Sequence, residues 1–127
     1  MKLTQAFFIG FVVIFNLQGY SQSNEVKMQS NDSIKAVQLL KIAGEIYEFY
    51  PDSAQKYAEE ALELSQKLNE KKGIANAILK QGIIEEHRKN YVAALSFYKQ
   101  GLQIAEENQL FQQTIFFYSN ILNLYFY

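Results

Sequence analysis

Two stretches of the sequence, PDSAQKYAEEALELS at residues 51–65 and YVAALSFYKQGLQIA at residues 91–105, decide the fold because they follow one helical pattern. They lie 40 positions apart, and this offset places small residues on small ones and large residues on large ones. The matched pairs are Ala54 with Ala94, Tyr57 with Phe97, Ala61 with Gly101, Leu62 with Leu102 and Leu64 with Ile104. A repeat of this length indicates stacked supersecondary units, none of which can bury its apolar face alone.

Small residues at fixed positions in these helices explain why the pattern repeats. They let the two helices of a hairpin approach closely, while the large residues between them fill the remaining space. These small positions are Ala54, Ala61, Gly82, Ala94 and Gly101. The offset also carries the next helical segment onto the last one, pairing Ile78 with Tyr118, Gly82 with Leu122 and Glu85 with Tyr125.

Apolar residues at helical spacing predict an all-α chain from residue 32 onward. Polar residues 31–33 can cap a first helix, so we expect that helix to begin there. Pro51 ends it, because the residue before a proline is pushed out of the helical region. The predicted hairpins cover residues 32–69 and 72–108, and a partial repeat covers residues 111–127.

Composition excludes several functions. The chain has no cysteine, so it forms no disulfide and no thiolate metal site. Its formal net charge of −1 argues against nucleic acid as a partner, since such binding needs clustered Lys and Arg. We expect no cofactor.

The amino terminus has the features of a signal peptide over residues 1–21. Lys2 gives a positive start, and residues 6–15 are apolar apart from one glycine. This stretch is short for a membrane span, which needs roughly 20 apolar residues, and the small Ser21 suits cleavage. The alternative is an uncleaved anchor. We expect residues 22–31 to form a flexible linker, and the chain to be exported to the periplasm or cell envelope.

The pattern of small and large residues resembles the tetratricopeptide repeat across residues 32–127. The positions that match are Ile78, Gly82, Tyr91, Ala94, Leu95, Tyr98, Gly101 and Leu102. Gln81 stands where the family has Leu, Glu85 where it has Tyr, and Gly101 where it has the last Ala. The resemblance implies a right-handed stack of antiparallel helical hairpins, an α-solenoid of about two and a half repeats.

One phrase is similar to a narrower group of proteins. The run PDSAQKYAEEALELSQKLNEKKGIA at residues 51–75 resembles the exported repeat regions of bacterial sensor histidine kinases and regulators. This implies an alternative function, in which the chain is the amino-terminal sensory fragment of a two-component histidine kinase or of a helix-turn-helix regulator, truncated before its signalling modules.

The resemblance also implies a concave groove, lined by the first helix of each unit, that binds a peptide or protein. Carried over by position, the groove residues are Lys41, Asn76, Leu79, Lys80, Ile83, His87, Phe116, Asn120 and Asn123, with Leu40, Gly44 and Ser119 beside them. Lysine and asparagine suit a peptide with an acidic group or a free carboxylate. The alternative is that these are ordinary exposed polar positions.

Catalysis is not expected. His87 is the only histidine, and no nucleophile, acid and base can be grouped from the sequence, so we predict an interaction scaffold and not an enzyme. An aromatic cluster gathers near the carboxyl end, at Phe111, Phe116, Phe117, Tyr118, Tyr125, Phe126 and Tyr127. We interpret these residues as core positions that a further helix would cover. Alternatively, they form a surface for self-association. We expect no membrane span beyond the signal segment.

Overall fold

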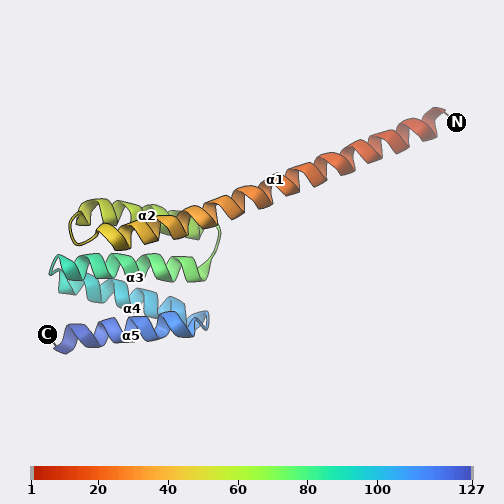
Figure 1. Ribbon diagram of the computed structural model, residues 1–127. Helices are drawn as coiled ribbons and strands as arrows, with labels where there is room; N and C mark the ends of the chain where they lie inside the picture. The colour runs from red at the N-terminus through yellow and green to blue at the C-terminus, as the bar shows by residue number, and fades with distance from the viewer. Residues whose placement is uncertain (1, 127) are drawn as a thin grey trace. The chain divides into compact units, whose positions relative to one another are not determined.

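The computed structural model describes the backbone of residues 2–126 and the side chains of residues 18, 19 and 21–126. This part of the chain forms five helices and no strand, which confirms the all-α class (Figure 1). The helices are α1 (Lys2–Ile46), α2 (Pro51–Lys67), α3 (Lys71–His87), α4 (Tyr91–Glu107) and α5 (Phe111–Phe126). The chain divides into two compact units, Met1–Asn31 and Asp32–Tyr127.

The first unit is helical where a linker was predicted. Residues 22–31 belong to α1, and their side chains are exposed. The helix also passes through residues 31–33, so the predicted helix start there is wrong. The physical reason is that residues 22–31 contain no Pro or Gly, while Glu25, Lys27 and Met28 are good helix formers.

The predicted signal peptide lies mostly outside the residues whose side chains the structure describes. Only residues 18, 19 and 21 of that segment are described beyond their backbone. Within the described part of the chain, none of the helices has both the length and the apolar character that crossing a membrane requires.

In the second unit, consecutive helices run side by side in opposite directions, joined by short turns (Figure 1). Three of these turns share one geometry. Asn69, Lys89 and Gln109 each have a positive φ, of 54°, 63° and 56°. The amide of the next residue bonds back to the preceding helix each time: Glu70 to Ser65, Asn90 to Glu85 and Leu110 to Ala105, at 2.9, 2.8 and 2.8 Å. This is a Schellman ending repeated at every twentieth residue.

The small positions lie where neighbouring helices touch. Gly82 of α3 lies against the ring of Tyr98 from α4, and Gly101 of α4 lies against the ring of Phe117 from α5. A Cβ atom at either glycine would overlap the ring, and both rings are fully buried. The predicted close contacts are confirmed at Gly82 and Gly101, and the other three small positions, Ala54, Ala61 and Ala94, are fully buried.

Helix α3 is central to the second unit because it packs against α2, α4 and α5. Its Ile84 joins a cluster with Ala43 of α1 and Ala54 of α2. On the α2 side, Arg88 donates to Asp52 Oδ1 at 2.5 Å and to Glu85 Oε1 at 2.6 Å. One face of α3 therefore remains between α1 and α5, and the candidate site lies there.

Candidate functional site

A groove runs along α3 and consists of two pockets that share Ile83. The first, here called the lysine pocket, has a volume of about 280 Å³. Its lining residues are Val37, Leu40, Lys41, Asn76, Leu79, Lys80, Ile83 and Phe116. The second, here called the glutamate pocket, has a volume of about 570 Å³. Its lining residues are Tyr47, Ile83, Glu86, His87, Tyr91, Asn120, Asn123 and Leu124.

The structure brings all nine predicted groove residues together in these two pockets. Lys41, Asn76, Leu79, Lys80 and Phe116 line the lysine pocket, His87, Asn120 and Asn123 line the glutamate pocket, and Ile83 lines both. The α3 residues share a face because they follow one another at intervals of three and four positions, which is the spacing of one helix surface. The nine residues therefore lie in two neighbouring pockets that meet at Ile83.

Lys80 is the unusual cation of the lysine pocket. Its side chain is half-buried against Gly44, and a Cβ atom at Gly44 would lie 2.8 Å from Lys80 Nζ. Burial lowers the pKa of Lys80 below its usual value. Among the described residues, no carboxylate forms an ion pair with Lys80, and no acceptor forms a hydrogen bond with its Nζ. An anionic group placed here would gain a charge-assisted hydrogen bond with little competition from the protein.

Asn76 adds a hydrogen-bond donor to the same pocket. Its Oδ1 accepts a bond of 3.2 Å from Nε2 of Gln113, which is buried on α5. This bond orients the amide and leaves Asn76 Nδ2 without a partner in the described structure. Lys41 is exposed at the rim. The lysine pocket therefore offers donors and positive charge over an aliphatic floor.

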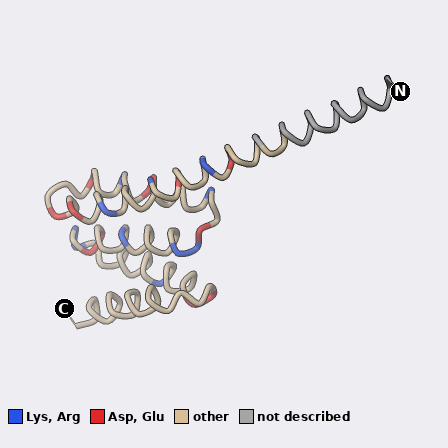
Figure 2. Tube along the Cα trace, turned by 45° about the vertical axis from the view of Figure 1, so that its right-hand side comes forward, with Lys and Arg blue, Asp and Glu red and all other residues tan. Residues whose placement is uncertain are grey.

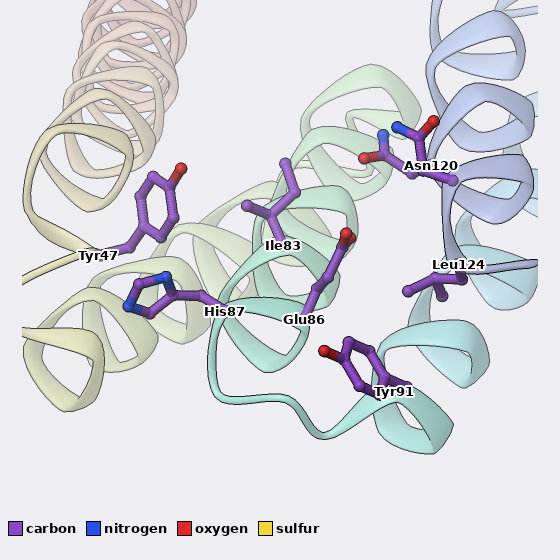
Figure 3. Close-up of a pocket in the computed structure, with 8 residues that line it drawn as sticks. Tyr47, Ile83, Glu86, His87, Tyr91, Asn120 and Leu124 are labelled. Atoms are coloured by element: carbon purple, nitrogen blue, oxygen red, sulfur yellow. The ribbon is translucent and has the colours of Figure 1, made fainter. Parts of the chain in front are cut away.

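The glutamate pocket has the opposite polarity. Figure 3 shows Tyr47 and His87 on one side, Asn120 and Leu124 across from them, and Glu86 and Tyr91 between. The buried Tyr98 donates its hydroxyl to Glu86 Oε2 at 2.6 Å. The carboxylate is thereby fixed in place on the pocket wall.

Burial and nearby carboxylates raise the pKa values of two tyrosines next to Glu86. Burial raises the pKa of Tyr98, and the hydrogen bond and charge of Glu86 raise it further. Burial also raises the pKa of Tyr47, with additional contributions from the charges of Glu48 and Glu86. A negative charge nearby disfavours ionisation of a phenol, so both shifts have the sign expected beside a carboxylate.

His87 is held by two contacts at the end of α3. Its Nε2–H donates to the backbone oxygen of Glu48 at 3.2 Å. Its ring also meets the ring of Tyr47 edge-on, with centroids 5.5 Å apart and planes at 87°. These contacts place His87 in the wall of the glutamate pocket. Among the residues that the structure describes, no group of three or more His, Cys, Asp or Glu side chains converges as metal ligands would.

Sequence reasoning missed five lining residues: Val37, Tyr47, Glu86, Tyr91 and Leu124. Helical spacing could have found three of them, because Val37 is four residues before Lys41, Glu86 is three beyond Ile83 and Leu124 is four beyond Asn120. Tyr47 directly follows α1 and Tyr91 begins α4, so both lie at helix boundaries, which spacing does not define.

Comparisons with protein-family models, with curated proteins and with solved structures found no match.

Proposed function

We propose that the chain is a protein-interaction module that binds a peptide segment of another protein along the groove of α1, α3 and α5. The observation that carries this proposal is Lys80, a half-buried cation with no protein partner in the described structure, at the floor of a concave surface. Burying a charge without a partner costs free energy. A ligand that supplies the missing anion would recover it.

The two pockets suit an extended peptide better than a small compact ligand. They follow each other along α3 and together involve residues 37–47 and residues 116–124 from the neighbouring segments. Aliphatic side chains of Leu79 and Ile83 provide apolar contact, and Asn side chains can bond both the donors and acceptors of a peptide backbone. An acidic side chain or a free carboxylate would occupy the lysine pocket.

We also propose a fold class for the second unit and a cellular compartment for the chain. The second unit is a tetratricopeptide-type solenoid, an assignment supported by the 40-residue repeat and by the three like turns at residues 69, 89 and 109. Export to the periplasm or cell envelope is supported by the apolar run at residues 6–15. The groove would then meet a partner outside the cytoplasm.

Binding to selected peptides tests the groove. Peptides are selected on the full chain from a random display library, and the affinity of each is measured by calorimetry. The double variant Lys41→Glu with Lys80→Glu should weaken binding by about 1 to 3 kcal/mol, because it replaces attraction of an acidic group by repulsion.

The matched control is Lys56→Glu with Lys99→Glu, which makes the same charge change at exposed positions of α2 and α4, outside the groove. It should leave affinity unchanged. Circular dichroism should show helical protein in all cases, because glutamate is as good a helix former as lysine. Selected peptides that bind the Lys41 and Lys80 variant as tightly as the original chain would refute the proposal.

A further inference from the structure

The glutamate pocket contains hydrogen-bond acceptors that no donor of the described protein satisfies. Glu86 Oε2 accepts from Tyr98, which leaves Glu86 Oε1 without a partner. None of the ion pairs formed by the described residues includes Glu86. Glu86 as a residue is half-buried in the pocket wall. A single carboxylate held by a buried hydroxyl on a pocket wall is a preorganised acceptor.

Asn120 adds a second acceptor from the opposite wall. Its Nδ2 donates to the backbone oxygen of Phe116 at 2.8 Å. This bond uses one of the two amide hydrogens of Asn120 on its own helix, and Asn120 Oδ1 has no partner in the described structure. The pattern is the reverse of Asn76, whose acceptor is used and whose donor remains. The two asparagines therefore give the two pockets opposite hydrogen-bonding character.

Aromatic rings complete the pocket. The rings of Tyr47 and Tyr91 lie on either side of Glu86 in Figure 3, and both line the pocket. Tyrosine faces attract ammonium and guanidinium groups, most strongly within about 6 Å of the ring centre. Leu124 and Ile83 contribute an apolar surface for the methylene chain that carries such a group. Carboxylate, amide oxygen, aromatic rings and aliphatic wall together match a lysine or arginine side chain.

We propose that the glutamate pocket binds a basic side chain, so that the groove selects peptides with an acidic and a basic residue two positions apart. This inference rests on the peptide-binding function proposed above and names the ligand class. Lys80 and Glu86 are six positions apart on α3, which is roughly 9 Å along the axis and about a third of a turn around it. Side chains two residues apart in an extended peptide lie on the same face at roughly 7 Å, and flexible side chains span the difference.

Five-residue synthetic peptides test the inference by nuclear magnetic resonance titration of the full chain. Two of them, Ac-Ala-Asp-Leu-Arg-Ala-NH2 and Ac-Ala-Arg-Leu-Asp-Ala-NH2, carry both charges in the two possible orders. In the control for each, Gln replaces Arg. One of the two charged orders should bind about tenfold more tightly than its Gln control, with signal changes at Glu86 and Asn120.

The variant Glu86→Gln should remove this tenfold preference. Glutamine keeps the shape of the side chain, and its Oε1 can still accept the Tyr98 hydroxyl, so the fold should be retained. The matched control, Glu63→Gln, makes the same charge change on the exposed face of α2 and should keep the preference. Equal affinity for Arg and Gln peptides in the original chain would overturn the basic-residue pocket.

Failure of this inference is distinguishable from failure of the groove itself. If the peptide affinity falls in Lys41→Glu with Lys80→Glu but the Arg preference does not change in Glu86→Gln, only the basic-residue pocket is refuted. If peptide binding shifts the resonances of α2 and α4 residues only, both the peptide groove and the basic-residue pocket are refuted.

Discussion

At the scale of single residues, two turn positions hold a backbone conformation that suits glycine better than the residue present. Lys89 and Gln109 have φ values of 63° and 56°, in the left-handed region. A side chain there clashes with the following carbonyl oxygen at a cost of roughly 1–2 kcal/mol. Asn69 occupies the equivalent place in the first of the three turns, and asparagine tolerates this region. The strain therefore lies in the second and third turns.

Replacing Gln109 by Gly should stabilise the chain by about 1 kcal/mol, because glycine adopts the left-handed conformation without a clash. The free energy of unfolding in urea measures this change. The control is Lys99→Gly on the exposed side of α4, where glycine should cost about 1 kcal/mol as it does inside any helix. A loss of stability in Gln109→Gly would show that residue 109 is not left-handed in solution.

At the scale of the helix, α5 has one buried side and one exposed apolar side. Phe117 is fully buried against α4. The exposed stripe consists of Phe111, Ile115, Tyr118, Leu122 and Tyr125, each 48% to 76% exposed. Their spacing of four, three, four and three residues is that of a helix–helix seam. Helix α5 also has no Asp, Glu, Lys or Arg, as Figure 2 shows by its uniform tan colour.

We expect the chain to self-associate through this stripe. Each large apolar side chain gains about 1.5–3 kcal/mol when it is fully buried. Helix α5 itself has no charged residue, and Glu106 beside the stripe accepts the Tyr118 hydroxyl at 2.7 Å, so a second α5 helix is a suitable partner for the stripe. Sedimentation over a concentration series should show an oligomer, and Ile115→Glu with Leu122→Glu should dissociate it by placing negative charges in the contact.

The control for the stripe changes equally apolar exposed residues elsewhere. Ile34→Glu with Ile42→Glu alters two exposed positions on α1, which are 53% and 40% exposed, and should leave the oligomer intact. A chain that sediments as a monomer at every concentration would contradict this prediction and would mean that the aromatic face is stable in water.

At the scale of the whole molecule, the sequence predicted those features that depend on helix periodicity. The pairing of Ala61 with Gly101 predicted two buried positions, whereas the groove residues were expected from the resemblance to the tetratricopeptide repeat and not from periodicity. Tyr47 directly follows α1 and Tyr91 is the first residue of α4, so both depend on helix boundaries, which periodicity does not define. Composition misled the prediction for residues 22–31. These residues are polar, which favoured a linker, but they contain no Pro or Gly that would end a helix.

If the chain is exported as proposed, we expect its leader to be removed. Residues 6–15 have the length and apolar character of a signal-peptide core, and Ser21 suits the cleavage site. Cleavage after Ser21 would remove Lys2, the only charged residue of that segment, so the net charge of −1 would become −1 − 1 = −2. Mass spectrometry of protein expressed in a bacterial host should therefore find an amino terminus near Gln22. The variant Val12→Arg should block processing, because a charge interrupts the apolar core, whereas Val12→Leu should be processed normally. If the unaltered protein still begins at Met1, export by cleavage is wrong, and the groove would then have to find its partner either from an anchored chain or inside the cell.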